Sequence, residues 1–394
     1  MDIKKIRNDF PILQKGFEEK QIIYFDNACQ TLRPIQVIDK IKEYYEDYPA
    51  CAGRSSHKLG IKVSEEVNNA RQKIAKFIGA KYDEIAFTRN TTEGINLVSS
   101  SLNFKEGDIV LLSDKEHNSN LLPWQRLKKK GVIISRFKFG DIESFQGQLN
   151  KKVKLVATLQ TSNIDGTSNP IEKMTKLTHD NGSLILVDAA QSVPHKNIDI
   201  KKSGIDFLAF SGHKMLGPSG TGALYMNKTV ADQLEPFIVG GDTVIDTSYD
   251  SAVYDKPPRK FEAGLQDYAG IIGFGEAAEY LKRIGMESIE KHENRLNKKL
   301  TDALYDQITL LGPKEPRERS GIFSFNMKGI QHHDIALLLD TKNIMIRSGM
   351  HCVHSWFHAN KVDGSARASL YFYNTEEECD IFIEEINKIK KLKR

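Results

Sequence analysis

Short apolar runs alternate with helical patterns along the first two-thirds of the chain, and this alternation constrains the fold more than any other feature. Helical patterns such as residues 91–102 and 169–182 separate the runs. Apolar runs separated by helices indicate parallel strands in a sheet that helices cover on both faces. The sequence therefore predicts an α/β fold with a mostly parallel sheet. Its expected strands are EIAFT (84–88), DIVLLSD (108–114), KLVATLQ (154–160), SLILVDA (183–189), DFLAF (206–210) and GALYM (222–226).

The chain has 394 residues, which is too long for one ordinary core. The alternation ends near residue 270, where two helical segments are followed by short strands and a last helix. That helix opens with Thr375 and Glu378 in the spacing of a capping box. We therefore predict an N-terminal segment (1–20) that packs on a small domain, a large domain (21–265), and the small C-terminal domain itself (266–394).

Charge and cysteine usage exclude several classes of protein. The chain has 56 basic and 52 acidic residues, and its net charge of +4 gives no electrostatic footprint for nucleic acid. Its four cysteines form no CxxC pair, which argues against a disulfide framework and a structural zinc site. No apolar run has the length of a signal peptide or a membrane span. We expect a cytoplasmic protein without partners among nucleic acids, membranes or metals.

Polar and ionisable residues follow the predicted strands. Ligands of open α/β sheets bind at the carboxyl ends of the strands, so these residues are candidates for one site. They are Thr91, Thr92, His117, Asn163, Asp188, Gln191, Ser211, His213 and Lys214.

The chemistry of these residues fits pyridoxal 5′-phosphate. Thr91 and Thr92 open a helix, whose N-terminal N–H groups suit a phosphate. A carboxylate such as Asp188 can hold a proton on a heteroaromatic nitrogen. A desolvated lysine such as Lys214 can form a Schiff base. Each residue alone also fits a turn, a helix start or a surface position, so the prediction depends on their order at successive strand ends.

Cys352 lies in the stretch RSGMHC (347–352), and three roles are open to it. Free cysteine is among the most buried residue types, so Cys352 could be a packing residue. Its neighbours His351, His354 and His358 suggest a metal ligand, although their spacing matches no standard zinc pattern. A thiolate stabilised by a nearby cation or proton acceptor, for which Arg347 and His351 are candidates, would instead be a nucleophile.

The sequence resembles the pyridoxal-phosphate enzymes of the class V aminotransferase group, which have fold type I, and is most similar to cysteine desulfurases of the SUF type. FSGHK is the most specific cofactor signal and RSGMHC the most specific activity signal. The resemblance implies a seven-stranded sheet in a large, cofactor-binding domain. The matching stretches cover nearly the whole chain in the family's order: YFDNA (24–28), FTRNTTEGINLV (87–98), EHNSNLLPWQ (116–125), SNIDGTSNP (162–170), VDAAQSV (187–193), FSGHKMLGPSGTGALY (210–225), FEAG (261–264), RSGMHC (347–352) and RASLYFYNT (367–375).

The resemblance implies a role for each residue around the cofactor. Lys214 would form the Schiff base, and Asp188 would pair with the ring nitrogen. Gln191 would hydrogen-bond the ring hydroxyl, while His117 would stack on the ring and act in catalysis. The residues around the phosphate would be Thr91, Thr92, Ser211 and His213.

The resemblance likewise implies how the substrate is held and attacked. Asn163, which also belongs to the cofactor site, and Arg367 would bind the carboxylate of L-cysteine, with Arg347 nearby. Cys352 would attack the sulfur and keep it as a persulfide while L-alanine leaves. The enzyme would be a homodimer that passes the sulfur to an acceptor protein of iron–sulfur cluster assembly. A selenocysteine lyase, or another class V lyase or transaminase, is the alternative, and a catalytically idle sulfur carrier is a third hypothesis.

Three positions depart from the family's pattern. Asn118 stands where a second histidine is usual, and we expect this change to be tolerated because His117 keeps the stacking role. Leu265 stands where a threonine usually reaches the cofactor phosphate across the dimer interface, so Gln266 is a candidate replacement. Gly53 stands where a histidine is common. These departures indicate a divergent branch.

Overall fold

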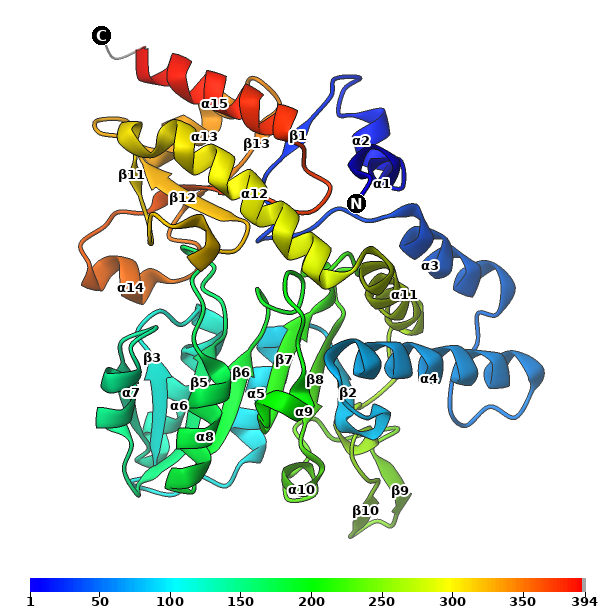
Figure 1. Ribbon diagram of the computed structural model, residues 1–394. Coiled ribbons are helices and arrows are strands. Elements are labelled where there is room, and N and C mark those ends of the chain that lie inside the picture. Colours follow the sequence, from blue (N-terminus) through cyan, green and yellow to red (C-terminus); the bar gives the residue numbers. More distant parts are fainter. Residues whose placement is uncertain (392–394) are drawn as a thin grey trace.

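A sheet of seven strands forms the centre of the molecule (Figure 1). The computed structural model describes residues 1–391, and every predicted strand of the large domain lies in this sheet. The strands pair in parallel, except that β8 runs antiparallel to both of its neighbours. The predicted fold class is therefore confirmed. In spatial order the strands are β2 (Ile85–Thr88), β8 (Gly222–Met226), β7 (Phe207–Ser211), β6 (Leu184–Asp188), β5 (Val153–Leu159), β3 (Ile109–Ser113) and β4 (Ile133–Phe137).

The strand β4 was missing from the prediction. It lies at an edge of the sheet, where Ile133 and Arg136 are exposed and only Phe137 is buried. An edge strand that is open to solvent needs no continuous apolar run, so its sequence signal is weak.

Helices cover both faces of the sheet, because successive strand residues point to opposite sides. In β3, for example, Leu111 packs in one core while Val110 and Leu112 pack in the other. The core of Leu111 includes residues of α3 (Ile35–Asp47), α4 (Lys58–Ile78), α7 (Ile142–Gln148), α8 (Ile171–Asn181), α9 (Ile200–Ser203) and α11 (Tyr268–Ile284). The opposite core includes residues of α5 (Thr91–Ser101), α6 (Leu122–Arg126) and α10 (Lys228–Ala231).

A second, antiparallel sheet lies beside the carboxyl edge of the first (Figure 1). Its strands, in spatial order, are β11 (Thr309–Leu310), β12 (Ile322–Asn326), β15 (Ser365–Ser369) and β14 (Arg347–Gly349). It shares a core with helices α12 (Met286–Leu304), α13 (His332–Asp340) and α15 (Glu376–Lys391). The predicted capping box is present, since the backbone N–H of Glu378 donates to Thr375 Oγ1 and the backbone N–H of Thr375 donates to Glu378 Oε2, both at 3.1 Å.

The N-terminal segment, with α1 (Ile3–Arg7) and α2 (Pro11–Lys15), contacts both parts of the molecule. Arg7 pairs with Glu378 at 2.8 Å, and the ring of Phe10 packs on Tyr280 of α11 and on Tyr373. A parallel pair formed by β1 (Ile23–Tyr24) and β13 (Ile344–Met345) also ties the beginning of the chain to its last third. Helix α11 follows residue 265 but packs against α3 and α4 beside the large sheet. The domain limits at residues 20 and 265 therefore stay a prediction.

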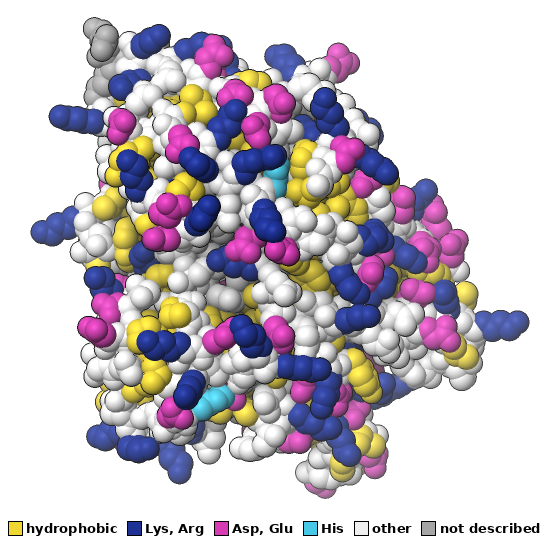
Figure 2. All heavy atoms as spheres, in the orientation of Figure 1, with side chains coloured by type: hydrophobic (Ala, Val, Ile, Leu, Met, Phe, Trp, Pro, Cys, Tyr) yellow, Lys and Arg dark blue, Asp and Glu magenta, His cyan; other side chains and the backbone are white. Residues whose placement is uncertain are grey.

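The surface carries both charges in near balance. Basic and acidic side chains are interspersed over the face shown in Figure 2. Across residues 1–391, none of the helices has the length and apolar character needed to cross a membrane.

Candidate functional site

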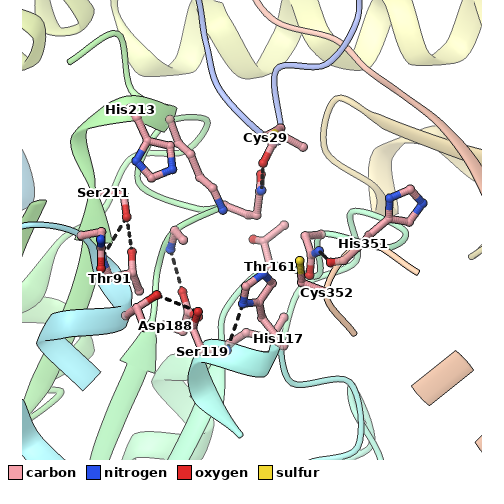
Figure 3. Close-up of a pocket in the computed structure, with 18 of the residues that line it drawn as sticks. Cys29, Thr91, His117, Ser119, Thr161, Asp188, Ser211, His213, His351 and Cys352 are labelled. Carbon is pink, nitrogen blue, oxygen red and sulfur yellow. Dashed lines mark hydrogen bonds between the residues drawn. The ribbon is translucent and has the colours of Figure 1, made fainter. Parts of the chain in front are cut away.

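A pocket of about 250 Å³ lies where the carboxyl edge of the large sheet meets the second sheet (Figure 3). Every residue predicted for the site lines it. From the large sheet and its loops these are Thr91, Thr92, His117, Asn163, Asp188, Gln191, Ser211, His213 and Lys214, and from the second sheet and its loops Arg347, Cys352 and Arg367. The structure thus brings together side chains that are far apart in sequence, whereas their individual roles remain predictions.

The N-terminus of α5 forms one end of the pocket. Its first residue, Thr91, contacts Ser211 through its backbone N–H at 2.8 Å and through its hydroxyl at 2.7 Å. A Cβ on Gly222 would come within 2.7 Å of Asn90 Cα, so a glycine at this position lets β8 approach the start of the helix. Within this turn the Thr91 N–H donates to Ser211 and the Glu93 N–H donates to Asn90 Oδ1, so the positive end of the helix dipole and the hydroxyl groups around it are what suit an anion such as a phosphate.

Asp188 and Lys214 are two ionisable side chains that line the pocket. Burial raises the pKa of Asp188, while the backbone N–H of Ala190 and the charge of Lys214 oppose that rise. Burial also lowers the pKa of Lys214, and Asp188 opposes this change. A lysine with a lowered pKa has more of the free amine that attacks a carbonyl carbon.

Unpaired polar atoms on Gln191 and Arg367, two of the residues that line the pocket, indicate what it can hold. Gln191 donates from Nε2 to the carbonyl of Ala28 at 2.7 Å, while its buried Oε1 has no hydrogen-bond partner in the described part of the chain. Arg367 donates from Nη1 to the carbonyl of Asn163 at 2.9 Å, while its Nε is likewise unpaired among residues 1–391. Leaving such a group unpaired costs about 1–3 kcal/mol. Gln191 Oε1 can accept a hydrogen bond from the ring hydroxyl of pyridoxal phosphate, and Arg367 Nε can donate one to the carboxylate of an amino acid.

His117 is neutral in the pocket. Burial is the main cause that lowers its pKa to about 3, and the charges of Lys214, Arg367 and Arg347 add to the effect. Its Nδ1 accepts the backbone N–H of Ser119 at 3.1 Å. The proton of the neutral ring therefore lies on Nε2, which makes that nitrogen a hydrogen-bond donor.

Cys352 lies on the loop between β14 and α14 (His354–Ala359), and it is exposed. Its sulfur points into the pocket on the side of His117 (Figure 3). Cys352 has φ +59° and His351 has φ +48°, so two adjacent residues with side chains are in the left-handed region. The packing role considered from the sequence is wrong for this exposed thiol.

The expectation that His351 supports a Cys352 thiolate needs correction. The ring of His351 turns away from the pocket (Figure 3), and its Nε2 is 2.9 Å from Ser365 Oγ. Burial, together with Arg367 and Arg347, lowers the pKa of His351 to about 2, so the ring supplies no positive charge. Among residues 1–391 no group of three His, Cys, Asp or Glu side chains is placed to bind a metal ion.

Cys29 lines the pocket, and Asp26 contacts it through Arg367, although neither residue was among the predicted site residues. Arg347 donates from Nη1 to Cys29 Sγ, and Arg367 Nη2 lies 3.5 Å from Asp26 Oδ1. Both residues precede the first strand of the large sheet: Asp26 lies within the matched stretch YFDNA (24–28) and Cys29 follows it. That match was the sequence feature from which their place in the site could have been predicted. Gln266, the candidate replacement for the threonine that is usual at position 265, donates its amide to the carbonyls of Ala263 and Gly264 in its own loop.

Comparisons with known proteins agree with this geometry. The family model described as aminotransferase class-V matches residues 23–382. A probable cysteine desulfurase of Pyrococcus abyssi is 40% identical over 98% of this chain and 97% of its own length. The cysteine desulfurase of Haloferax volcanii is 35% identical over 100% of this chain and 98% of its own.

Two solved structures show the same similarity. The apo structure of the cysteine desulfurase from Thermococcus onnurineus NA1 is 37% identical, with a TM-score of 0.94 over 98% of both chains. The cysteine desulfurase CsdA from Escherichia coli is 27% identical, with a TM-score of 0.92 over 100% of this chain and 99% of that one.

Proposed function

This chain belongs to the class V aminotransferase family and, within it, to the cysteine desulfurases, and we propose that it takes the sulfur of L-cysteine as a persulfide on Cys352 and releases L-alanine. The observation that carries the proposal is one pocket that holds both Lys214 and Cys352. The direct test is mass spectrometry of the protein after incubation with L-cysteine. We expect one added sulfur atom on the peptide that contains residue 352 and stoichiometric alanine, and an unmodified peptide would contradict the proposal.

The residues of the large sheet fit pyridoxal phosphate. When bound, this cofactor supplies an electron sink for the charge left by loss of the α-proton of the substrate. Lys214 would hold it covalently, Asp188 would keep a proton on the ring nitrogen, and Gln191 Oε1 would accept the ring hydroxyl. Ser211 and the first turn of α5 would hold the phosphate.

His117 orients the reacting groups. Because its Nδ1 accepts the Ser119 N–H, His117 presents Nε2–H to the pocket on the side of Cys352. We propose that the ring stacks on the cofactor and donates this hydrogen bond to sulfur. A donor of this kind stabilises the negative charge of a thiolate.

Arg367 is the proposed carboxylate clamp. It is buried, its Nε is unpaired within the described chain, and it is tied to Asn163 and Asp26. These ties fix the guanidinium plane before substrate arrives, so little side-chain freedom is lost on binding.

Replacing Arg367 with lysine should lower kcat/KM for L-cysteine by about 10- to 100-fold, mainly through KM, because an ammonium cannot reproduce a bidentate pair. Steady-state kinetics with the cofactor-loaded protein measures this. Arg319→Lys is the matched control, since Arg319 is as deeply buried beside the second sheet but does not line the pocket. An unchanged KM in Arg367→Lys would remove Arg367 from the carboxylate site.

The exposed position of Cys352 suits delivery of sulfur to another protein. We propose that the acceptor belongs to iron–sulfur cluster assembly, as for SUF-type enzymes, and that the reaction takes place in the cytoplasm. All four cysteines, each within the described residues, are unpaired, which fits a reducing compartment.

We also propose that the enzyme is a homodimer. The hairpin of β9 (Val244–Thr247) and β10 (Ala252–Tyr254) projects from the body and exposes Ile245, Tyr249 and Val253 to solvent (Figure 1). Leu265, the departure residue, is 74% exposed. A second copy that covers these side chains would remove their unfavourable contact with water.

Replacing Val253 with aspartate on this hairpin should shift the protein from dimer toward monomer, because a charge would be buried at the interface. Light scattering after size-exclusion chromatography measures the mass. Ile133→Asp serves as the control, since Ile133 is similarly exposed on the edge strand β4. A dimer of undiminished stability in Val253→Asp would place the interface elsewhere.

A further inference from the structure

The loop that carries the nucleophile is held against the large sheet at several points. We call residues 350–359, from the end of β14 through α14, the nucleophile arm. Asn163 Nδ2 donates to the carbonyl of His351 at 2.8 Å, and the backbone N–H of Asn118 donates to the carbonyl of Cys352, also at 2.8 Å. In addition, Asn118 Nδ2 lies 3.0 Å from His354 Nδ1, in the first turn of α14. Asn118 thus contacts the arm on both sides of Val353.

The large-sheet side of this contact is rigid. Asn118 begins a short turn, and Glu116, two residues before Asn118, is almost fully buried. The Glu116 carboxylate accepts the amide of Asn120 at 2.6 Å and the backbone N–H of Leu159, in β5, at 3.0 Å. The turn that carries His117 and Asn118 is therefore fastened to the central sheet.

The arm itself stores strain at the nucleophile. Side chains disfavour the left-handed backbone that His351 and Cys352 adopt, so contacts outside these two residues must maintain it. Buried Val353 and Phe357 pack on Ile164 and hold the far side of the arm. On the side of the pocket, the contacts of Asn118 and Asn163 do so.

We propose that Asn118 is a positioning residue, which clamps the nucleophile arm through His354 and so holds Cys352 over the cofactor site. The inference rests on the proposed function of Cys352, but the contact between Asn118 and the nucleophile arm does not depend on any reaction at Cys352. The same turn carries His117, so the clamp fixes the distance between the Nε2 donor and the sulfur. Asn118 touches neither substrate nor cofactor in this role.

A double-mutant cycle tests the clamp. In the cofactor-loaded protein, Asn118→Ala and His354→Ala should each slow single-turnover persulfide formation by about threefold, the effect of one exposed hydrogen bond, with KM for L-cysteine unchanged. The double variant should be no slower than either single variant, because both remove the same contact. A double variant slowed by the product of the two single effects would overturn the proposal, as would single variants that keep the wild-type rate.

Hydrogen exchange gives a readout that needs no turnover. Without L-cysteine, amide exchange in the nucleophile arm should be about threefold faster in both single variants, because the arm opens more often. The amides of Val353, Trp356 and Phe357, which donate within the arm, report this opening. Unchanged exchange would overturn the clamp, whereas a wild-type protein that never forms a persulfide would overturn only the proposed function.

Asn360→Ala is the matched control. Asn360 also donates from an exposed side chain, but its partner is the carbonyl of Trp356 within the same helix end. Persulfide formation should keep the wild-type rate in this variant. An equal slowing in Asn360→Ala would mean that any loosening of the arm has the same effect, and would remove the specific role of Asn118.

Discussion

Replacing Lys214 with alanine will remove the yellow absorbance of covalently held pyridoxal phosphate and will lower L-cysteine turnover by at least about 1,000-fold. The reason is that Lys214 lies in the pocket with its pKa lowered by burial, and so provides the free amine that holds the cofactor aldehyde. The visible spectrum of the purified protein with added cofactor, and alanine release, measure the two effects.

Lys196→Ala separates this chemistry from a general loss of stability. Lys196 is a second partly buried lysine, with its pKa also lowered by burial, and it donates to Ser168 Oγ at 2.8 Å outside the pocket. Its replacement should leave the visible band in place. An unchanged spectrum in Lys214→Ala would refute the covalent assignment, and with it the fit of the pocket to pyridoxal phosphate.

Replacing Cys352 with alanine should preserve the visible band but reduce persulfide formation and sulfur release by at least about 100-fold. The pocket keeps its cofactor residues in this variant, since none of them depends on the Cys352 side chain for a hydrogen bond described in residues 1–391. Mass spectrometry of the intact protein and of its peptides measures added sulfur. Undiminished sulfide release would count against Cys352 as the nucleophile.

The other thiols provide the controls for that experiment. Cys51 is exposed but lies outside the pocket, and burial raises the pKa of Cys379 far above the range in which a thiolate forms. Neither Cys51→Ala nor Cys379→Ala should alter persulfide formation. Cys29→Ala is more informative, because Cys29 shares the pocket. Loss of persulfide formation in Cys29→Ala, together with added sulfur on Cys29 in the Cys352→Ala variant, would show that the attack takes place at Cys29 instead.

The sequence predicts that the polar residues after the large-sheet strands lie together in one site, because this follows from local patterns. Apolar runs of strand length mark β5, β6 and β7, and the polar residues directly after them must lie at one edge, because these strands are parallel. Asp188 and Lys214 were placed correctly for this reason. The edge strand β4 could not be predicted in this way, because its partly exposed residues do not form the continuous apolar run on which the argument depends.

The electrostatics of Cys352 could not be predicted in the same way. The sequence puts His351 beside it, but the left-handed backbone at both residues turns the His351 ring into the second sheet. The contact of Arg347 with Cys29 joins residues 318 positions apart, and no periodicity or motif spacing encodes such a pair.

By itself, the sequence determined the class of fold, the positions along the chain of the strands that carry the cofactor residues, and the presence of a cysteine in an RSGMHC motif, since each is written in short-range patterns of polarity and side-chain chemistry. Only the tertiary structure decided which side chains face one another across the two sheets: a neutral His117, and not His351, lies on the side of the pocket where the Cys352 sulfur points, and Asn118 holds the arm that carries it. Those choices depend on long-range hydrogen bonds and on backbone dihedrals that packing imposes, and the energy of such contacts has no counterpart in local sequence.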